Sequence, residues 1–193
     1  MSINIYSMKK IILILLMHTV FFSCAQTYPL NTYYDVPVNA YIKDLNNDLL
    51  PYQGSWVGNW DNKTFLITFM RIKKFQNYDL NKSYYKDVLV GKFKVTDSNG
   101  LVIYDNTLLP NENTKIEGLR FLMQPTKRYS LYYYDEDLCG MTGNIYINFA
   151  STDLTKLTWR YSDMTDIITE ECPYYNANPF PKPLPENIIL TKQ

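Results

Sequence analysis

The stretch that decides the fold is YQGSWVGNWDNKTFLITFMRI, residues 52–72. Large apolar side chains recur at even spacing on both sides of the central DNK sequence. They are Tyr52, Trp56 and Trp60 before it, and Phe65, Ile67 and Phe69 after it. Successive side chains of a β-strand point to opposite faces, so this spacing predicts two strands that each have one apolar face. DNK is typical of a turn, and the stretch therefore predicts an antiparallel hairpin.

The same alternation continues toward the C-terminus in six further runs with short polar connections. They are VLVGKFKVT (88–96), LVIYD (101–105), IEGLRFLM (116–123), RYSLYYY (128–134), NIYINF (144–149) and KLTWRY (156–161). DSNG, at residues 97–100, is a strong hairpin signal between the first two. Eight short strands without helices between them predict an all-β fold, a single antiparallel meander closed as a barrel or, alternatively, folded as a β-sandwich.

The flanks of this meander predict the rest of the domain. Residues 39–50 carry Tyr41, Ile42, Leu45 and Leu49 at helical spacing, which favours one short N-terminal helix. The C-terminal segment 173–185 is too rich in proline for a central strand, whereas NIILT at 187–191 could add a final edge strand. We therefore expect a single β domain over residues 39–193.

The N-terminus has the pattern of a secretory signal. Residues 8–24, MKKIILILLMHTVFFSC, hold two lysines and an apolar run too short to span a bilayer, so 1–23 is predicted to be a signal peptide and 1–7 to lie upstream of the true start. Ser23-Cys24 resembles a bacterial lipobox, which would make Cys24 the lipidated first residue and 24–38 an anchor and tether. Ordinary cleavage after Ala25 is the alternative. The first reading predicts a cell-envelope protein held on a membrane and facing the periplasm or the cell surface; the second predicts a soluble secreted or periplasmic protein.

Removal of the signal also removes His18, which is the single histidine. Without imidazole, Ser-His-Asp and Cys-His catalysis and histidine metal sites are not expected. An enzyme would have to use carboxylates, for example in the acidic stretch from Asp163 to Glu171. Loss of Lys9 and Lys10 leaves 17 basic residues against 19 acidic ones, which gives no electrostatic case for nucleic acid. No cofactor and no metal site is predicted.

Two cysteines remain, Cys139 and Cys172. In an oxidising compartment they predict a disulfide, with two buried free thiols as the alternative. Asp135 and Asp137 precede Cys139 in the sequence DEDLCG, which begins like a calcium-binding loop but lacks the later ligands. A solvated turn is therefore the expected structure there.

Gly54-Ser55-Trp56 at the start of the first strand resembles the G-x-W signature of lipocalin-like β-barrels. The resemblance implies that Trp56 closes one end of the barrel and that Arg160, in LTWRYS, packs across its ring as a structural barrel-end pair. The chain as a whole also resembles an uncharacterised family of Bacteroidota lipoproteins, from SCAQTYPLNT to the final IILTKQ. This second resemblance implies an envelope location and no particular activity.

A barrel of this size predicts a non-catalytic binding module for a small apolar or amphipathic ligand. The candidate ligand-binding residues are Trp56, Trp60, Phe69, Phe93, Tyr133 and Trp159. The alternative is a structural or protein-interaction lipoprotein with a barrel filled by its own side chains, whose partner would be an envelope protein. Clustered tyrosines, such as Tyr132 to Tyr134, could stack on sugar rings or remain a half-buried rim.

Overall fold

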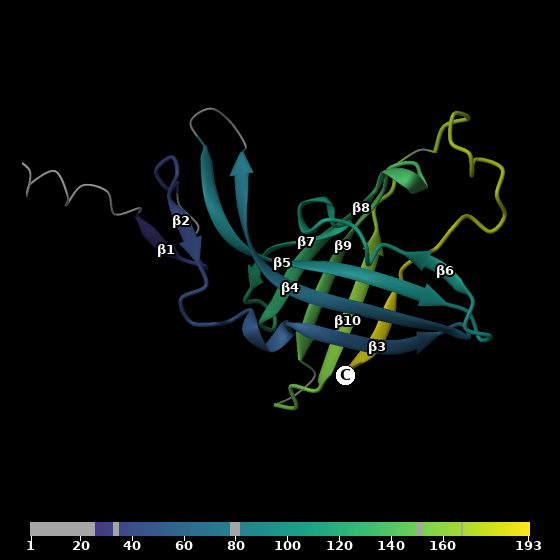
Figure 1. Ribbon diagram of the computed structural model, residues 1–193, viewed down its shortest axis with the longest axis horizontal. Helices are drawn as coiled ribbons and strands as arrows, with labels where there is room; N and C mark the ends of the chain where they lie inside the picture. Colours follow the sequence, from purple (N-terminus) through teal and green to yellow (C-terminus); the bar gives the residue numbers. More distant parts are fainter. Residues whose placement is uncertain (1–25, 33–34, 78–81, 150–151, 167) are drawn as a thin grey trace, which may run out of the picture.

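The computed structural model describes residues 26–32, 35–77, 82–149, 152–166 and 168–193. These residues form strands and three one-turn 3-10 helices, η2 (Leu50–Tyr52), η3 (Asn111–Asn113) and η4 (Glu136–Leu138) (Figure 1). The strands are β1 (Thr27–Pro29), β2 (Tyr41–Lys43), β3 (Gly54–Trp60), β4 (Lys63–Asn77), β5 (Ser83–Thr96), β6 (Val102–Asp105), β7 (Ile116–Leu122), β8 (Arg128–Asp135), β9 (Met141–Phe149), β10 (Lys156–Asp163) and β11 (Asn187–Lys192). The all-β prediction is confirmed.

Eight of the strands close into an antiparallel barrel. Its order is β3-β4-β5-β7-β8-β9-β10-β11, and β11 pairs with β3 to complete the ring. The other closing contact is short, Val90 opposite Glu117 and Gly91 opposite Ile116, between β5 and β7. The predicted barrel is therefore confirmed, and the sandwich alternative is wrong.

Two of the predicted strands occupy positions other than those expected. β6, expected within the meander, lies off the barrel and pairs only with the end of β5, from Lys94 to Thr96. β11, expected at an edge, is a barrel strand between β10 and β3. Three strands pair with successive parts of one edge of β5: first β2, then β7, then β6. β7 pairs with the part that closes the ring, so β6 lies outside the ring.

The barrel interior is filled by side chains from every strand of the ring. The largest fully buried ones are Trp56, Trp159, Tyr129, Tyr133, Phe65, Phe69 and Phe93. Two glycines lie where a side chain would collide with this packing: a Cβ on Gly118 would lie 2.6 Å from Cε1 of the Tyr129 ring, and one on Gly58 would lie 2.5 Å from Cδ1 of Ile188. Such distances are well inside van der Waals contact, so the interior accepts no further atoms at these positions.

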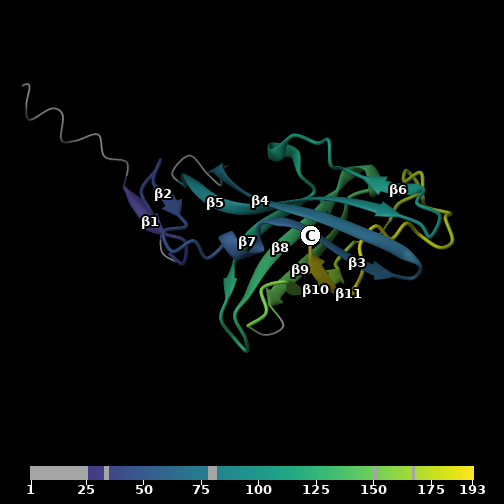
Figure 2. The same ribbon diagram turned by 60° about the horizontal axis from the view of Figure 1, so that its bottom comes forward.

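β4 and β5 extend beyond the barrel as a two-stranded arm, and β1 and β2 lie beside it (Figures 1 and 2). β2 runs parallel to β5, with Tyr41 opposite Tyr85, and β1 runs parallel to β2. β1 falls in the segment expected to be a tether. The predicted signal peptide and Cys24 lie outside the described residues.

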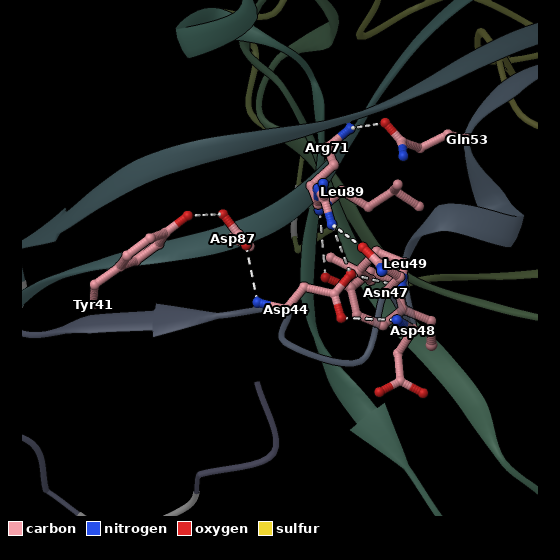
Figure 3. Close-up of polar contacts among 10 residues, drawn as sticks. Tyr41, Asp44, Asn47, Asp48, Leu49, Gln53, Arg71, Asp87 and Leu89 are labelled. Atoms are coloured by element: carbon pink, nitrogen blue, oxygen red, sulfur yellow. Dashed lines mark hydrogen bonds and ion pairs between the residues drawn. The ribbon is translucent and has the colours of Figure 1, made fainter. Parts of the chain in front are cut away.

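The short helix predicted over residues 39–50 is wrong. Its apolar residues Tyr41 and Ile42 belong to β2, and the following chain turns around the carboxylate of Asp44 (Figure 3). That carboxylate is buried and accepts hydrogen bonds from the backbone N–H of Asp48 (2.8 Å) and of Leu49 (3.0 Å). Nη1 of Arg71, from β4, lies 3.1 Å from the same carboxylate. Tertiary partners thus replace the helical hydrogen bonds, and only η2 remains helical.

A second buried carboxylate, that of Asp87 on β5, completes this network. It accepts a hydrogen bond from the Tyr41 hydroxyl at 2.6 Å and another from the backbone N–H of Asp44 at 2.9 Å (Figure 3). Burial, followed by the hydrogen bond to Asp87, raises the pKa of Tyr41 to about 12. Both carboxylates are used to hold the loop and β2 against the barrel, so this cluster has a structural role.

Candidate functional site

One end of the barrel is closed around Trp56. Its indole N–H donates a hydrogen bond to the backbone oxygen of Tyr52 at 2.8 Å, which holds η2 over this end. Nζ of Lys192 lies 5.2 Å from the centre of the indole ring and donates to the backbone oxygen of Pro51 at 3.1 Å. This end is therefore closed by groups of the protein itself.

The predicted pairing of Trp56 with Arg160 is wrong. Lys192 stands directly opposite Trp56 in the β3–β11 register, so its side chain reaches the ring. Arg160 follows the inward-facing Trp159 on β10, and alternation places Arg160 on the exposed outer face. A cation does pack on the Trp56 ring, but it is a lysine from the last strand of the barrel.

The six candidate ligand-binding residues lie mostly in the packed interior. Trp56, Phe69, Phe93, Tyr133 and Trp159 are all buried. Trp60 is partly buried, with the Lys63 ammonium 5.2 Å from its ring centre. Phe93 also lines a surface hollow, which is described below.

The predicted disulfide between Cys139 and Cys172 is confirmed. Cys139 follows η4 in a left-handed conformation, and Cys172 belongs to the proline-rich segment after β10. The bond thus fastens that segment to the barrel end where β6 and η4 lie. Leu138 and Tyr174, close to the two half-cystines, both line the hollow at this end.

Three adjoining hollows form a furrow that begins at the end of the barrel near β6 and η4 and continues over the outer face of β7 and β8. Their volumes are about 260, 480 and 510 Å³. The first and second share Lys115 and Asp137, and the second and third share Glu117 and Tyr132. The furrow therefore runs from β6 and η4 to the β4–β5 arm, where Gln76 and Tyr84 line it, and we call its first hollow the Asn106 pocket.

Asn106 is the unusual residue of that pocket. It is only 7% exposed, and its Oδ1 accepts a hydrogen bond from the backbone N–H of Phe93 at 2.6 Å. That donor fixes the orientation of the side-chain amide, because Nδ2 in the same place would face a second donor. Within the part of the chain that the structure describes, Nδ2 has no hydrogen-bond partner. A buried donor without a partner is rare in folded proteins.

A lysine and two aspartates form the wall opposite Asn106. Nζ of Lys115 lies 2.6 Å from Oδ1 of Asp135 and 2.7 Å from Oδ2 of Asp137. Burial alone would lower the pKa of Lys115, but the hydrogen bonds to these two carboxylates outweigh it and raise that pKa. Asp135 is buried and also accepts from the Tyr133 hydroxyl at 2.8 Å. The solvated turn expected for Asp135 is therefore wrong at that residue.

Tyrosine rings and charged groups line the other two hollows. Tyr132 and Tyr134, on the outer face of β8, are 38% and 49% exposed. Glu117 accepts hydrogen bonds from Lys74 and from Gln76 of the arm. Lys86 donates to the backbone oxygen of Leu119 at 2.6 Å, and burial, followed by the nearby Arg120 charge, lowers its pKa. The furrow thus presents flat aromatic faces beside fixed polar groups.

The carboxylates considered for hydrolysis, those of Asp163, Asp166, Glu170 and Glu171, belong to exposed residues and do not line the three hollows of the furrow. Asp163 accepts hydrogen bonds from the backbone and hydroxyl of Thr165. Among the described residues, His, Cys, Asp and Glu do not gather in groups of three suited to a metal ion. None of the helices in the described ranges is long and apolar enough to cross a membrane.

The family of this chain is known from its match to a protein-family model. A family model matches residues 8–193. The chain belongs to a family of unknown function, DUF6705. No match to the DUF6705 chain was found among curated proteins or among solved structures.

Sequence reasoning did not single out Asn106 or Lys115. Asn106 stands in YDNTLLP, where an asparagine after a short strand is ordinary for a turn, and its burial depends on the pairing of β5 and β6. The tyrosine runs were the one local signal that pointed toward the furrow, through Tyr132 and Tyr134.

Proposed function

We propose that this DUF6705 chain is a non-catalytic binding module of the cell envelope, which takes an amphipathic ligand along the furrow outside its barrel. One observation carries the proposal: the interior is filled by its own rings, whereas the furrow offers open hollows in which tyrosine faces adjoin polar groups. Concave surfaces of mixed apolar and polar character are the usual sites of ligand binding.

The envelope location is supported by two features of the chain. Residues 8–24 have the pattern of a signal that ends at a lipidated cysteine, and lipid at Cys24 would hold the domain at a membrane. The Cys139–Cys172 disulfide fits an oxidising compartment.

A non-catalytic role is supported by the state of the furrow carboxylates. Asp135 and Asp137 are held by Lys115, and Glu117 is held by Lys74 and Gln76. These contacts hold the carboxylates in fixed positions as hydrogen-bond acceptors, an arrangement that suits ligand binding.

The filled interior also favours a second candidate, a structural or protein-interaction role without any small ligand. One experiment distinguishes the two candidate functions. The protein is extracted gently from its own envelope, and its mass is recorded under native and then denaturing conditions. A mass that is lost on denaturation identifies a bound small ligand.

The furrow is tested in the same experiment with the Tyr132→Ala/Tyr134→Ala protein. The matched control is Tyr85→Ala: Tyr85 is 36% exposed but faces the opposite side of β5 from Tyr84 and Lys86, which line the furrow. We expect the additional mass on the wild type and the control but not on the double variant. Equal masses for the wild type under both conditions would favour the structural role. Retention by the double variant would place the ligand elsewhere.

A further inference from the structure

The third hollow of the furrow, of about 510 Å³, lies where β5 changes its neighbour. It is lined by Lys86 from β5 and by the β7 residues 117–120, and we call it the Arg120 hollow. β7 pairs with β5 at Val90 and Gly91, whereas β2 pairs with the same edge at Tyr85 and Lys86. The hollow therefore lies beside the place where one partner strand gives way to the other.

A β-bulge turns Arg120 toward this hollow. Ile116 and Gly118 are buried on the inner face of β7, so unbroken alternation would point residue 120 inward as well. Instead, the pairing of β7 with β8 shifts between Gly118 and Arg120, and Phe121 is the next buried residue. Arg120 is thereby exposed and lines the hollow. Bulges that redirect a side chain in this way are over-represented next to active sites.

The positive charge of the Arg120 hollow is not balanced by the carboxylate that lines it. Oε2 of Glu117 is paired with the Lys74 ammonium, and its Oε1 accepts a hydrogen bond from Gln76 at 3.0 Å. Lys86 donates to a backbone oxygen, which is a neutral acceptor. In the described part of the chain, neither Lys86 nor Arg120 forms an ion pair with a carboxylate. Two cations of the hollow thus lack a counter-charge there.

Both cations are accessible from solvent, since Arg120 is exposed and Lys86 is half-buried. Burial, followed by the charge of Arg120, lowers the pKa of Lys86, so the two side chains act on each other as like charges. An anion that contacts both would offset this repulsion and accept hydrogen bonds from each. Guanidinium and ammonium groups bind the oxygens of carboxylates and phosphates. The hollow therefore requires an oxyanion.

The adjoining hollow suits an apolar group attached to that oxyanion. Tyr132 lines both hollows, and Tyr134 and Leu109 line the second one. These side chains offer apolar surface along which an alkyl or ring system can lie. One ligand can therefore contact Arg120 with its head and the tyrosines with its apolar part.

We propose that the Arg120 hollow binds the anionic head of the amphipathic ligand, a carboxylate or a phosphate that Lys86 and Arg120 hold together. The proposal rests on the proposed function and names the ligand class of the same furrow.

The test measures affinity for the full chain by isothermal titration calorimetry, with amphiphiles that share an eight-carbon chain and are kept below their micelle concentrations. Octanoate and octyl phosphate carry the anionic heads, octyl glucoside a neutral head, and octyltrimethylammonium a cationic one. Acetate and inorganic phosphate supply the anionic heads without the chain. We expect octanoate and octyl phosphate to bind about tenfold or more tightly than the other four compounds, and less tightly as NaCl is added.

Variants of the two cations make the result specific. Arg120→Gln keeps hydrogen-bond donors and removes the charge, so affinity for octanoate and octyl phosphate should fall by about tenfold. Lys86→Gln should act in the same direction, whereas Arg120→Lys should retain most of the affinity. Arg160→Gln is the matched control, because Arg160 is an exposed arginine of β10 that does not line the furrow, and it should leave affinity unchanged.

Two further measurements guard against misreading. The dispersion of the 15N amide spectrum shows whether each variant is folded; if Lys86→Gln is not, the exposed Arg120→Gln change still tests the hollow. In the folded wild type, the backbone amides of residues 117–120 should shift on addition of octanoate. Binding of octanoate without a shift in these amides would place it elsewhere and overturn the proposal.

The proposal is also overturned if none of the six compounds binds, if octyl glucoside or octyltrimethylammonium binds as tightly as the two anionic amphiphiles, or if inorganic phosphate binds as tightly as octyl phosphate. Equal losses of affinity in Arg160→Gln and Arg120→Gln would overturn it as well. A neutral ligand on the extracted protein, retained through Tyr132 and Tyr134, would refute this inference while leaving the proposed function intact.

Discussion

The ammonium of Lys192 lies 5.2 Å from the ring centre of Trp56, so the last strand of the barrel covers the tryptophan of its first strand. The same ammonium donates a hydrogen bond to Pro51 in η2. One lysine thus connects the first and last strands of the barrel with the 3-10 helix that covers this end. The relationship has a direct energetic consequence.

Lys192→Met keeps the length of the side chain and removes its charge. We expect a loss of about 1–2 kcal/mol in the free energy of unfolding, because a cation–π contact and a hydrogen bond are both lost. Urea denaturation measures it. Arg160→Met, an exposed change on β10, is the control and should stay within about 0.5 kcal/mol. A larger loss for Arg160 than for Lys192 would refute this assignment of the barrel-end cation.

Gly118→Ala tests whether the interior is full. A methyl group there meets the Tyr129 ring, so we expect a loss of about 1–3 kcal/mol in unfolding free energy from overpacking. In a Tyr129→Leu background the added cost should fall, because the smaller side chain leaves space. A Gly118→Ala protein as stable as the wild type would show that the interior has unoccupied room.

Asp44→Asn tests the network that replaces the predicted helix. The substitution removes the charge that is paired with Arg71 and turns an acceptor of two backbone N–H groups into a partial donor. We expect a loss of about 3 kcal/mol, as for other broken buried pairs. Asp48→Asn removes a more exposed pair with Lys127 and should cost less than about 1 kcal/mol. Equal effects of the two substitutions would argue against a structural role for Asp44.

Tyr52 makes stability depend on alkaline pH. Burial, followed by the nearby Asp48 charge, raises the pKa of Tyr52 from 10.0 to about 12. The folded protein therefore holds this proton more tightly than the unfolded chain, and its contribution is complete below pH 10 and is lost as the pH rises toward 12.

In the Tyr52→Phe protein, urea midpoints should consequently fall less steeply between pH 10 and pH 12 than in the wild type. Tyr134→Phe, at a half-exposed ring, serves as the control and should follow the wild-type curve. Parallel curves for the wild type and Tyr52→Phe would contradict the prediction.

The sequence predicted the barrel because period-two alternation is a local signal. It did not predict which short runs close the ring: LVIYD became the outlying β6 and NIILT the barrel strand β11, although both have similar β-rich composition. That choice depends on pairing between residues far apart in the chain, such as Thr191 with Val57. The pairing of strands that are far apart in the chain cannot be predicted from either segment alone.

The prediction of an N-terminal helix was wrong for a related reason. Tyr41, Ile42 and Leu49 fit helical spacing, but Asp44 finds a stronger set of partners in Arg71 and the 48–49 backbone. Tertiary contacts override local preference in such cases. The disulfide, in contrast, could be predicted from the number of cysteines and the expected oxidising compartment.

The candidate site was the least predictable part. Aromatic residues of the strands were expected to line a cavity, yet most of them fill the core, while the furrow is built from outward residues such as Glu117 and Tyr132. An alternating strand pattern does not reveal whether the interior is full, since that depends on the summed volumes of all eight strands.

The most direct measurement of the central claim is hydrogen–deuterium exchange by mass spectrometry, on the protein with its envelope-derived ligand and on the same protein freed of it. Binding along the furrow predicts slower exchange with ligand in segments 106–115 and 136–139, which border the furrow, and no change in β3 or β10. Slower exchange in β3 and β10, with segments 106–115 and 136–139 unchanged, would place the ligand inside the barrel and contradict the account.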